Sequence, residues 1–512
     1  MRELQVELLS NLALGFQTVI SPQNLLYCFL GTMIGTLIGV LPGIGPVQTI
    51  AILLPTTFAL PPVSALIMLA GIYYGAQYGG STTSILVNVP GEASSVVTCL
   101  DGYQMALQGR AGAALTVSAL GSFVAGSFAA LLIAILAIPL SELAFKFGPA
   151  EYFSLMVFGL IGSIVFASGS PMKAIGMIVL GLLFGVVGTD ITSGTQRFSL
   201  GIPELADGIG FVPLAMGLFG ISQIINSLEQ KEKREILKTK IFGFWLNKKD
   251  LKEVAPAVAR GTLTGSLLGI LPGGGGILSS FISYMLEKKV SHNPESFGKG
   301  NICGVASPES ANNAGAQTSF IPLLTLGIPT NVVMAMMAGA MMIHGIQPGP
   351  RVISSNPELF WGVIVSMWVG NLMLVILNLP LIGIWVKLLT VPYRVLYPAI
   401  LLFCCIGIYS VNNNIFDIWL TAILGFLGYL FVKLECEPAP LILGFVLGPM
   451  MEENLRRGML LSRGDPSIFI TRPLSLAFLL MAFAMLIIIA VPAIRRRRED
   501  AFGQEREELP KK

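Results

Sequence analysis

The feature that most constrains this chain is a run of 84 residues, Leu8 to Gly91, with no Asp, Glu, Lys or Arg. A helix of about 20 apolar residues is long enough to span the hydrocarbon core of a bilayer. The run therefore accommodates several spans, and we expect a polytopic membrane protein. Charged residues form 12% of the 512-residue chain, whereas soluble domains carry about 25%. This composition argues against an ordinary soluble enzyme.

Further stretches without charged residues follow that run. Together they predict roughly 11 or 12 helical crossings, at about 20 residues per crossing. Their continuous apolar character, without strict alternation, favours helices over a membrane β-barrel, so we expect an all-α polytopic membrane protein. The predicted spans lie within 111–141, 152–172, 174–189, 208–228, 261–286, 310–350, 359–386, 395–416, 418–432, 438–451 and 473–494.

An internal repeat is the second strong feature. Residues 31–45 read GTMIGTLIGVLPGIG and residues 261–275 read GTLTGSLLGILPGGG, with nine identical positions. A second pair follows, GAQYGGSTTSILVNVP at 75–90 and GAQTSFIPLLTLGIP at 315–329. Glycines at every fourth position allow another helix to pack closely. The pattern predicts two homologous membrane repeats.

Two clusters of charge divide the chain. Residues 229–253 hold 13 charged residues, eight of them Lys or Arg, and the C-terminal tail begins with four Arg. The positive-inside rule places both in the cytoplasm. We expect a first membrane repeat at 1–228, a charged cytoplasmic loop at 229–256, a second repeat at 257–494 and a cytoplasmic tail at 495–512. The repeats could be parallel or inverted; we expect an inverted relation, which would permit a rocking or elevator movement.

The Pro-Gly step that ends each glycine row predicts a broken or re-entrant helix at the centre of each repeat. Proline removes a helical hydrogen bond, and freed backbone groups in a bilayer are tolerated where they line a cavity. The N-terminus of a half-helix holds an anion without any basic residue. A simple packing kink is the alternative. The predicted substrate-binding residues are Pro42, Gly43, Gly45, Ser81, Thr82, Thr83, Pro90, Gly91, Pro272, Gly273, Gly274, Gly275, Thr330 and Asn331.

Polar clusters next to these breaks suit a small hard cation, which takes oxygen ligands. Such residues are costly in a bilayer unless they face water, a substrate or one another. Ordinary hydrogen bonding between helices is the alternative. We expect an ion site, with sodium as the possible metal, at Asn88, Glu309, Asn312, Asn313 and Gln317.

Three carboxylates lie beside the motifs, and each is a candidate proton carrier or loop cap. Asp101 lies in LDGYQMALQGRAG, which reads as a short polar connection, so we expect a loop role. Glu92 suits a helix N-terminus. Glu309 fits either role.

Several classes of protein lack support in the sequence. There is no GxxxxGK[ST] phosphate loop, no CxxC pair, and only two histidines, at 292 and 344. No basic patch with aromatic residues indicates nucleic acid as a partner. A membrane-embedded enzyme would need catalytic residues that the sequence does not display, so we expect no enzyme activity and no cofactor.

At these motifs the sequence resembles the large membrane subunit of bacterial tripartite tricarboxylate transporters, and the resemblance extends through nearly the whole chain. The family favours small residues where Gln317, Thr318 and Ser319 stand and after GIP, where Thr330 and Asn331 stand, and Gln77 also departs from the pattern. These differences bear on substrate choice. The matching segments are GVLPGIGP at 39–46, YYGAQYGGSTTSILVNVPGE at 73–92, LDGYQMALQGRAGAAL at 100–115, PESANNAGAQ at 308–317, IPLLTLGIP at 321–329 and GFVLGPMMEENLRRGMLLS at 444–462.

The resemblance implies a permease subunit in the bacterial inner membrane that imports a di- or tricarboxylate. It also implies two protein partners, a small four-helix membrane subunit and a periplasmic solute-binding protein. A sodium or proton gradient would drive uptake, without ATP. A stand-alone carboxylate carrier or a passive anion channel is the alternative.

Overall fold

The computed structural model describes residues 2–41, 45–166, 170–190, 192–229, 246–272, 275–388 and 393–490, and these are mostly helical. Pro42, Gly43, Gly273 and Gly274, the loop at 230–245 and the tail at 495–512 lie outside the described residues. Within the described ranges, the strands form one antiparallel pair, in which Gly188 lies opposite Arg197.

Before the charged loop the chain forms a series of helices, then the strand pair, and then a final helical segment. In chain order they are α1 (Arg2–Ile20), α2 (Pro22–Val40), α3 (Pro46–Thr57), α4 (Pro62–Val87), η1 (Ala93–Ser95), α5 (Val96–Thr98), η2 (Cys99–Tyr103), α6 (Gln104–Leu107), α7 (Ala111–Ala144), α8 (Pro149–Phe166), α9 (Pro171–Gly185), β1 (Gly188–Thr189), β2 (Gln196–Arg197), η3 (Pro203–Leu205), α10 (Phe211–Ala215), η4 (Met216–Ile221) and α11 (Ser222–Glu229).

The first helix after the charged loop, α12, starts at Lys248, inside the segment 229–256 predicted to form that loop. The domain boundaries themselves stay a prediction. The elements after the loop are α12 (Lys248–Gly269), α13 (Gly275–Val290), η5 (Pro294–Ser296), α14 (Cys303–Thr318), α15 (Phe320–Leu326), α16 (Val332–Ile343), α17 (Val352–Ser355), α18 (Pro357–Asn378), α19 (Ile382–Leu388), α20 (Tyr393–Asn412), α21 (Ile415–Lys433), α22 (Ala439–Leu461), α23 (Ile468–Thr471) and α24 (Pro473–Ala490).

The apolar helices agree with a membrane protein. In the described part of the chain, four helices are long and apolar enough to cross a bilayer, namely α2, α7, α18 and α21. Shorter apolar helices include α8, α9, α16 and α24. One predicted span is interrupted within the described residues. The uncharged stretch at 310–350 is divided into α14, α15 and α16.

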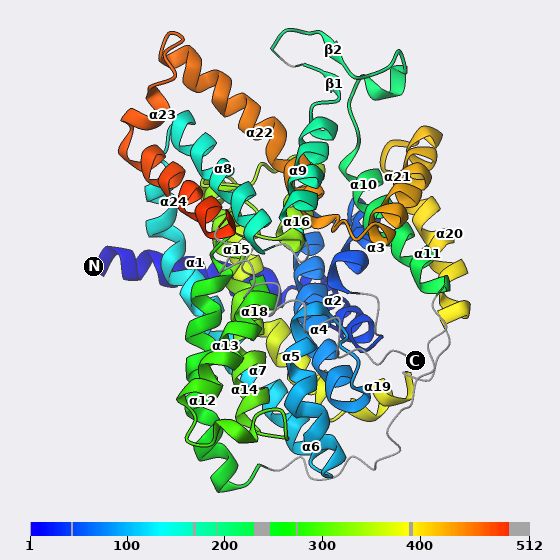
Figure 1. Ribbon diagram of the computed structural model, residues 1–512, viewed down its shortest axis with the longest axis vertical. Coiled ribbons are helices and arrows are strands. Elements are labelled where there is room, and N and C mark those ends of the chain that lie inside the picture. The colour runs from blue at the N-terminus through cyan, green and yellow to red at the C-terminus, as the bar shows by residue number, and fades with distance from the viewer. Residues whose placement is uncertain are drawn as a thin grey trace.

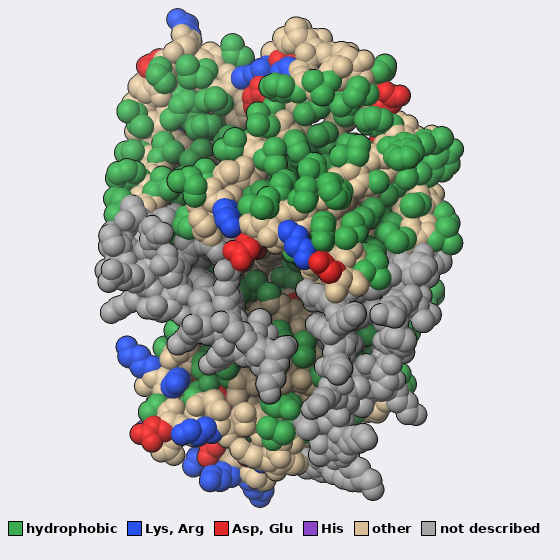
Figure 2. Space-filling model, turned by 45° about the vertical axis from the view of Figure 1, so that its right-hand side comes forward, with side chains coloured by type: hydrophobic (Ala, Val, Ile, Leu, Met, Phe, Trp, Pro, Cys, Tyr) green, Lys and Arg blue, Asp and Glu red, His purple; other side chains and the backbone are tan. Residues whose placement is uncertain are grey.

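The helices occupy two regions of the molecule. In Figure 1, α12, α13, α14 and α7 lie beside α2, α4 and α6 in the lower part, and α8, α9, α22 and α24 lie in the upper part. Figure 2 shows that hydrophobic side chains cover much of the upper half of one face, with a hollow near its middle. Among the large apolar side chains exposed on the surface are Val124, Leu372 and Phe426.

The two glycine rows pack in the same way. A Cβ added to Gly31, Gly35 or Gly39 of α2 would lie 2.3–2.4 Å from backbone oxygens of α4. A Cβ added to the corresponding glycines of α12, at 261, 265 and 269, would lie 2.2–2.3 Å from backbone oxygens of α14. These distances leave no room for a side chain, so the row permits direct backbone contact in both pairs.

The strand pair is fixed to α22 by ion pairs. Asp190 accepts hydrogen bonds from Arg456 at 3.0–3.1 Å and from the Ser193 hydroxyl at 2.8 Å. Hydrogen bonds from the Arg456 guanidinium and from Ser193 hold the pKa of the Asp190 carboxyl well below its ordinary value. Arg197 donates to Glu452 at 2.8 Å. These contacts hold the hairpin in place at one end of the molecule (Figure 1).

The expected polar connection around Asp101 is instead helical, because residues 93–107 form successive short helices with little regular loop between them. Asp101 is fully buried and caps another part of the chain. Its Oδ1 accepts from the backbone N–H groups of Gly298, Gly300 and Asn301 at 2.7–2.9 Å, and its Oδ2 accepts from the Tyr284 hydroxyl at 2.9 Å. The expected capping role of Asp101 agrees with these contacts, which join the first half of the chain to the second.

Asp101→Ala should lower the stability of the protein markedly. Three backbone N–H groups would lose their charged acceptor, at a total cost of about 3 kcal/mol. Asp101→Asn keeps an oxygen for the three amides and should lose less. Thermal unfolding of the purified variants in detergent measures both effects. An Asp101→Ala protein that unfolds at the wild-type temperature would show that this cap is not important for stability.

Candidate functional site

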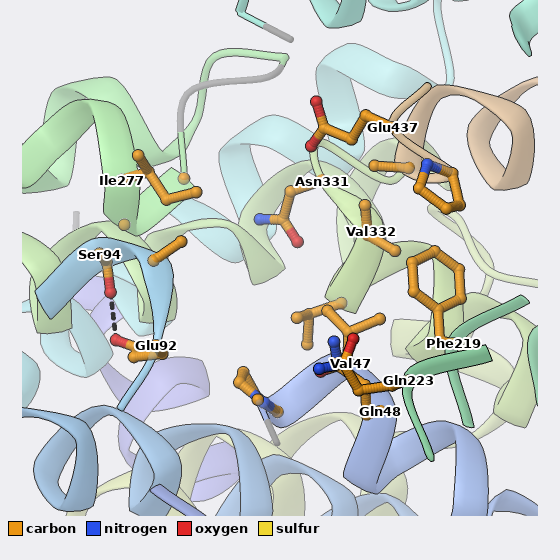
Figure 3. A pocket seen from close by; sticks show the side chains of 18 of the residues that line it. Val47, Gln48, Glu92, Ser94, Phe219, Gln223, Ile277, Asn331, Val332 and Glu437 are labelled. Carbon is orange, nitrogen blue, oxygen red and sulfur yellow. Dashed lines mark hydrogen bonds between the residues drawn. The ribbon is translucent and has the colours of Figure 1, made fainter. Parts of the chain in front are cut away.

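A cavity of about 540 Å³ lies where five helical segments begin. The first residues of α3, η1, α13, α16 and α22 all line it, and Figure 3 shows Val47, Ile277 and Val332 around its open space. The N-terminal turn of a helix has backbone N–H groups without helical acceptors and carries about half a positive charge. Several such ends at one cavity make it suitable for an anion.

The start of α3 is open towards the cavity because no side chain caps it. Gly45 is its N-cap in extended conformation, and Pro46 is the first helical residue. Proline is favoured there because its missing N–H would have no acceptor in any case. The N–H groups of Val47 and Gln48 are next in the first turn, so they are the donors that α3 offers to a ligand.

The starts of α13 and α16 lie near each other. Gly275 begins α13 with a φ of +49°, which favours glycine. The Asn331 side chain lies 3.4 Å from the position that a Cβ of Gly275 would take. Asn331 is the N-cap of α16, accepting from the Met334 N–H at 3.0 Å and donating to the Ser319 hydroxyl at 3.1 Å. Asn331 thus links the cavity to the end of α14.

The opposite wall comes from η4, α11, the end of α21 and the start of α22 with the residues just before it. It carries Leu218, Phe219, Ser222, Gln223, Val432, Glu437, Pro438 and Ala439. Among all the described residues that line the cavity there is no Lys, Arg or His. Any positive potential in it therefore comes from backbone N–H groups and helix ends.

Glu92 connects the cavity to the buried polar cluster. It is the N-cap of η1, as expected for this carboxylate, with a reciprocal capping box to Ser95. The Glu92 carboxylate also accepts from the Ser94 hydroxyl and from Asn312 Nδ2, the latter at 3.1 Å. Ser94 contacts Gln77 Oε1 at 3.0 Å. These bonds hold Glu92 at the edge of the cavity, as Figure 3 shows.

Glu309 lies at the centre of a second cluster, where α4, α5, α7 and α14 meet. It is 1% exposed, and its carboxylate contacts the hydroxyl groups of Ser81, Thr98 and Ser118. In the described part of the chain it makes no ion pair with a basic residue. On the same helix, Asn313 donates to the Ser122 hydroxyl at 2.7 Å and to the Glu309 carbonyl at 3.1 Å.

Comparison with known proteins identifies the family at this point. Residues 25–443 match the family model described as the tripartite tricarboxylate transporter TctA family. The chain belongs to the TctA family. The match covers all the helix starts at the cavity and the Glu309 cluster, so both lie in the matched part of the chain.

Two relatives from Agrobacterium vitis are similar to this TctA-family chain. One, named as an uncharacterized 52.8 kDa protein in the TAR-I ttuC' 3' region, is 57% identical over 98% of this chain and 100% of its own length. The other, named as an uncharacterized protein in the TAR-II ttuC' 3' region, is 59% identical over 47% of this chain and 100% of its own length. No solved structure matches the chain significantly.

The structure brings part of the predicted substrate set to the cavity. The predicted residues that line it are Gly45, Pro90, Gly91, Gly275 and Asn331. Gly91 is close to both α2 and α4, since a Cβ there would lie 2.1 Å from the Gly39 carbonyl and 2.5 Å from Gly80 Cα.

The other described residues of that set lie elsewhere. Ser81, Thr82 and Thr83 are inside α4, where Thr83 donates to the Val40 carbonyl at 2.9 Å, at the broken end of α2. Thr330 is buried with an unpartnered hydroxyl, and Pro272 lies against Gly162 of α8.

The predicted ion-binding residues are divided as well. Glu309, Asn312 and Asn313 lie in the polar clusters, and Gln317 lies about one turn beyond Asn313 on α14. Asn88 is exposed, in left-handed conformation at the end of α4 (φ +56°), and lies outside these clusters.

Sequence reasoning missed several residues of the site. Gln48 and Ser94 line the cavity, as do Phe219 and Gln223 from η4 and α11. Gln77, whose departure from the family pattern bears on substrate choice, lines it too. The signal for Gln48 and Ser94 was their place just after the repeated motifs. No motif marks Phe219 or Gln223, because they reach the cavity only through the tertiary packing of η4 and α11.

Proposed function

We propose that this chain is a secondary-active permease subunit that imports an organic di- or tricarboxylate across the bacterial inner membrane. The convergence of the starts of α3, α13 and α16 on one cavity without basic side chains carries the proposal. Backbone N–H groups at Val47, Gln48, Ile277 and Val332 would bind the carboxylate groups. The volume of about 540 Å³ suits a small ligand.

The coupling ion is proposed to act at Glu309. A buried carboxylate without a basic partner is costly in a low-dielectric site unless a proton or cation neutralises it. Ser81 can adapt to either charge state of Glu309, because its hydroxyl contacts both the Glu309 carboxylate and the backbone carbonyl of Gln77, the latter at 2.9 Å. Its single hydrogen can be donated to only one of them at a time. Ser81 would donate to an ionised Glu309, and would donate to Gln77 while accepting from a protonated Glu309.

Alternating access is proposed to arise from two inverted repeats. The shared motifs and the equal packing of α2 on α4 and α12 on α14 support a common ancestry of the two halves. The cavity residues then come from the breaks of both repeats, as in other transporters built in this way. An inverted relation requires residue 31 to enter from the periplasmic side. A reporter fused to Met1 that is found in the cytoplasm, with no extra span before residue 31, would contradict the inversion.

The partners are proposed from the family. Its tripartite organisation implies a small membrane subunit and a periplasmic binding protein that delivers the carboxylate. The central loop and the C-terminal tail would lie in the cytoplasm, because of their Lys and Arg content. A stand-alone carrier or a passive anion channel shares the helix ends but needs no delivery protein.

Purification of a tagged copy from native membranes, followed by mass spectrometry and transport assays, tests the proposal. We expect a stoichiometric small membrane protein to accompany the chain, and saturable counterflow of radiolabelled citrate or another carboxylate of a di- and tricarboxylate panel in proteoliposomes. If the chain purifies alone, the proposed tripartite organisation is contradicted. Anion conductance without saturable counterflow would favour the channel.

A further inference from the structure

Two buried amide side chains form a polar site apart from both the cavity and Glu309. Gln317 of α14 and Asn371 of α18 are each 0% exposed. None of their four side-chain polar atoms has a hydrogen-bond partner. Buried amides are almost always hydrogen-bonded, and an unpaired polar group inside a membrane protein costs several kcal/mol. Two such residues therefore point to a ligand.

The two amides meet over a glycine in the middle of α7. The Nε2 atom of Gln317 and the Nδ2 atom of Asn371 each lie 2.6 Å from the position that a Cβ of Gly126 would take. Both amide groups thus border the space that a side chain at this position would enter. Oxygen and nitrogen of an amide exchange places by rotation of the group. After that rotation both oxygens face the same small space.

We propose that Gln317 and Asn371 bind a sodium ion between α7, α14 and α18. A sodium ion takes oxygen ligands, and transporters supply them from side chains and from carbonyls at interrupted helices. Pro322 in α15 cannot donate the usual helical hydrogen bond to the carbonyl of Thr318, next to Gln317. The inference deepens the proposed function, on which it rests, by adding a sodium site with named ligands to the proton or cation site proposed at Glu309.

The site is connected to the carboxylate cavity through a short path. Gln317 is two residues before Ser319, whose hydroxyl accepts from Asn331 Nδ2 at 3.1 Å, and Asn331 lines the cavity. The ligands of the sodium site are neutral, so a negative charge nearby favours the cation. A carboxylate in the cavity supplies that charge, and each ligand should therefore tighten the binding of the other.

Binding of ²²Na⁺ to the purified full chain, with choline as the replacing cation, tests the site directly. We expect saturable binding by the wild type that is stronger when citrate, or the carboxylate selected from the panel, is present. Asn371→Leu and Gln317→Leu should each reduce sodium affinity at least tenfold. Gly126→Ala, which fills the space without removing a ligand, should do the same.

The matched control is Asn378→Leu, on the same helix. Asn378 is also buried and its Oδ1 is unpartnered, but its nitrogen donates to the Leu374 carbonyl at 3.0 Å and to Thr36 at 3.4 Å, and it lies away from Gly126. This variant should bind sodium as the wild type does. Without sodium, Asn371→Leu should unfold at or above the wild-type temperature, since it removes an unpaired polar group.

The outcomes separate this inference from the proposed function, because binding is measured without transport. If Glu309→Gln loses sodium binding while Asn371→Leu and Gln317→Leu keep it, the cation binds at Glu309 and the inference is overturned, although ion coupling stands. If the wild type binds no sodium in either condition, the inference is overturned as well. If Asn371→Leu is destabilised equally with and without sodium and keeps ²²Na⁺ binding, the two amides bond to each other and hold no ion.

Discussion

Val47→Asp is expected to reduce carboxylate uptake at least about 100-fold, because an added negative charge within about 4 Å of the bound carboxylate costs about 4 kcal/mol at an effective dielectric of 20. Val47 lies in the first turn of α3 and lines the cavity. An aspartate there favours the helix itself, since a negative charge interacts well with a helix N-terminus. Folding should therefore be retained while anion binding is lost. Uptake of radiolabelled carboxylate in proteoliposomes, at equal amounts of inserted protein, measures the effect.

Val47→Asn is the matched control. It has nearly the same size as aspartate and is polar, but it carries no charge. Uptake by this variant should stay within a few-fold of the wild type, because the backbone N–H groups remain available. Equal uptake by Val47→Asp and Val47→Asn would mean that no anion binds next to the start of α3.

Glu309→Gln is expected to abolish uptake driven by an ion gradient, by at least about 100-fold, which corresponds to about 2.7 kcal/mol. The variant removes the ionisable group but keeps the size of the side chain, and its amide can still bond to Ser81 and Thr98 by accepting from one hydroxyl and donating to the other. Exchange of internal for external carboxylate needs no net movement of the coupling ion and should persist. Gradient-driven uptake and counterflow, measured on the same proteoliposomes, separate the two activities.

Glu287→Gln provides the comparison for Glu309→Gln. Glu287 is also buried, but it pairs with Arg260 at 2.6 Å, so its charge is already balanced. This variant should keep gradient-driven uptake per inserted copy, whatever its effect on stability. If both variants retained coupling, a proton or cation on Glu309 would not be part of the transport cycle.

The helical membrane architecture could be predicted from the sequence, because long uncharged segments have few other solutions in a bilayer. The breaks were predicted at the right places as well. Val40 ends α2 and Gly45 caps α3, and Gly269 ends α12 before α13 begins at Gly275. Local chemistry determines these positions, since proline and glycine interrupt a helix wherever the chain is placed.

Which polar residues share a site could be predicted only in part. Gly91 and Asn331 follow the repeated motifs and do reach the cavity, whereas Ser81 is turned towards Glu309 inside α4. The direction of a side chain around a buried helix depends on the neighbouring helices. Asn371 lies outside every motif, in an apolar helix, and becomes a candidate ligand only where α18 meets α7 and α14.

A cryo-electron-microscopy map of the purified protein, with the carboxylate that most raises its unfolding temperature, tests the carboxylate site most directly. We predict ligand density in the cavity, within hydrogen-bonding distance of the N–H groups of Val47 or Gln48 in α3 and of Ile277 or Val332 in α13 and α16. The same density should be absent from the map of Val47→Asp. Ligand density elsewhere, with these helix starts unoccupied, would contradict binding of the carboxylate by converging helix N-termini.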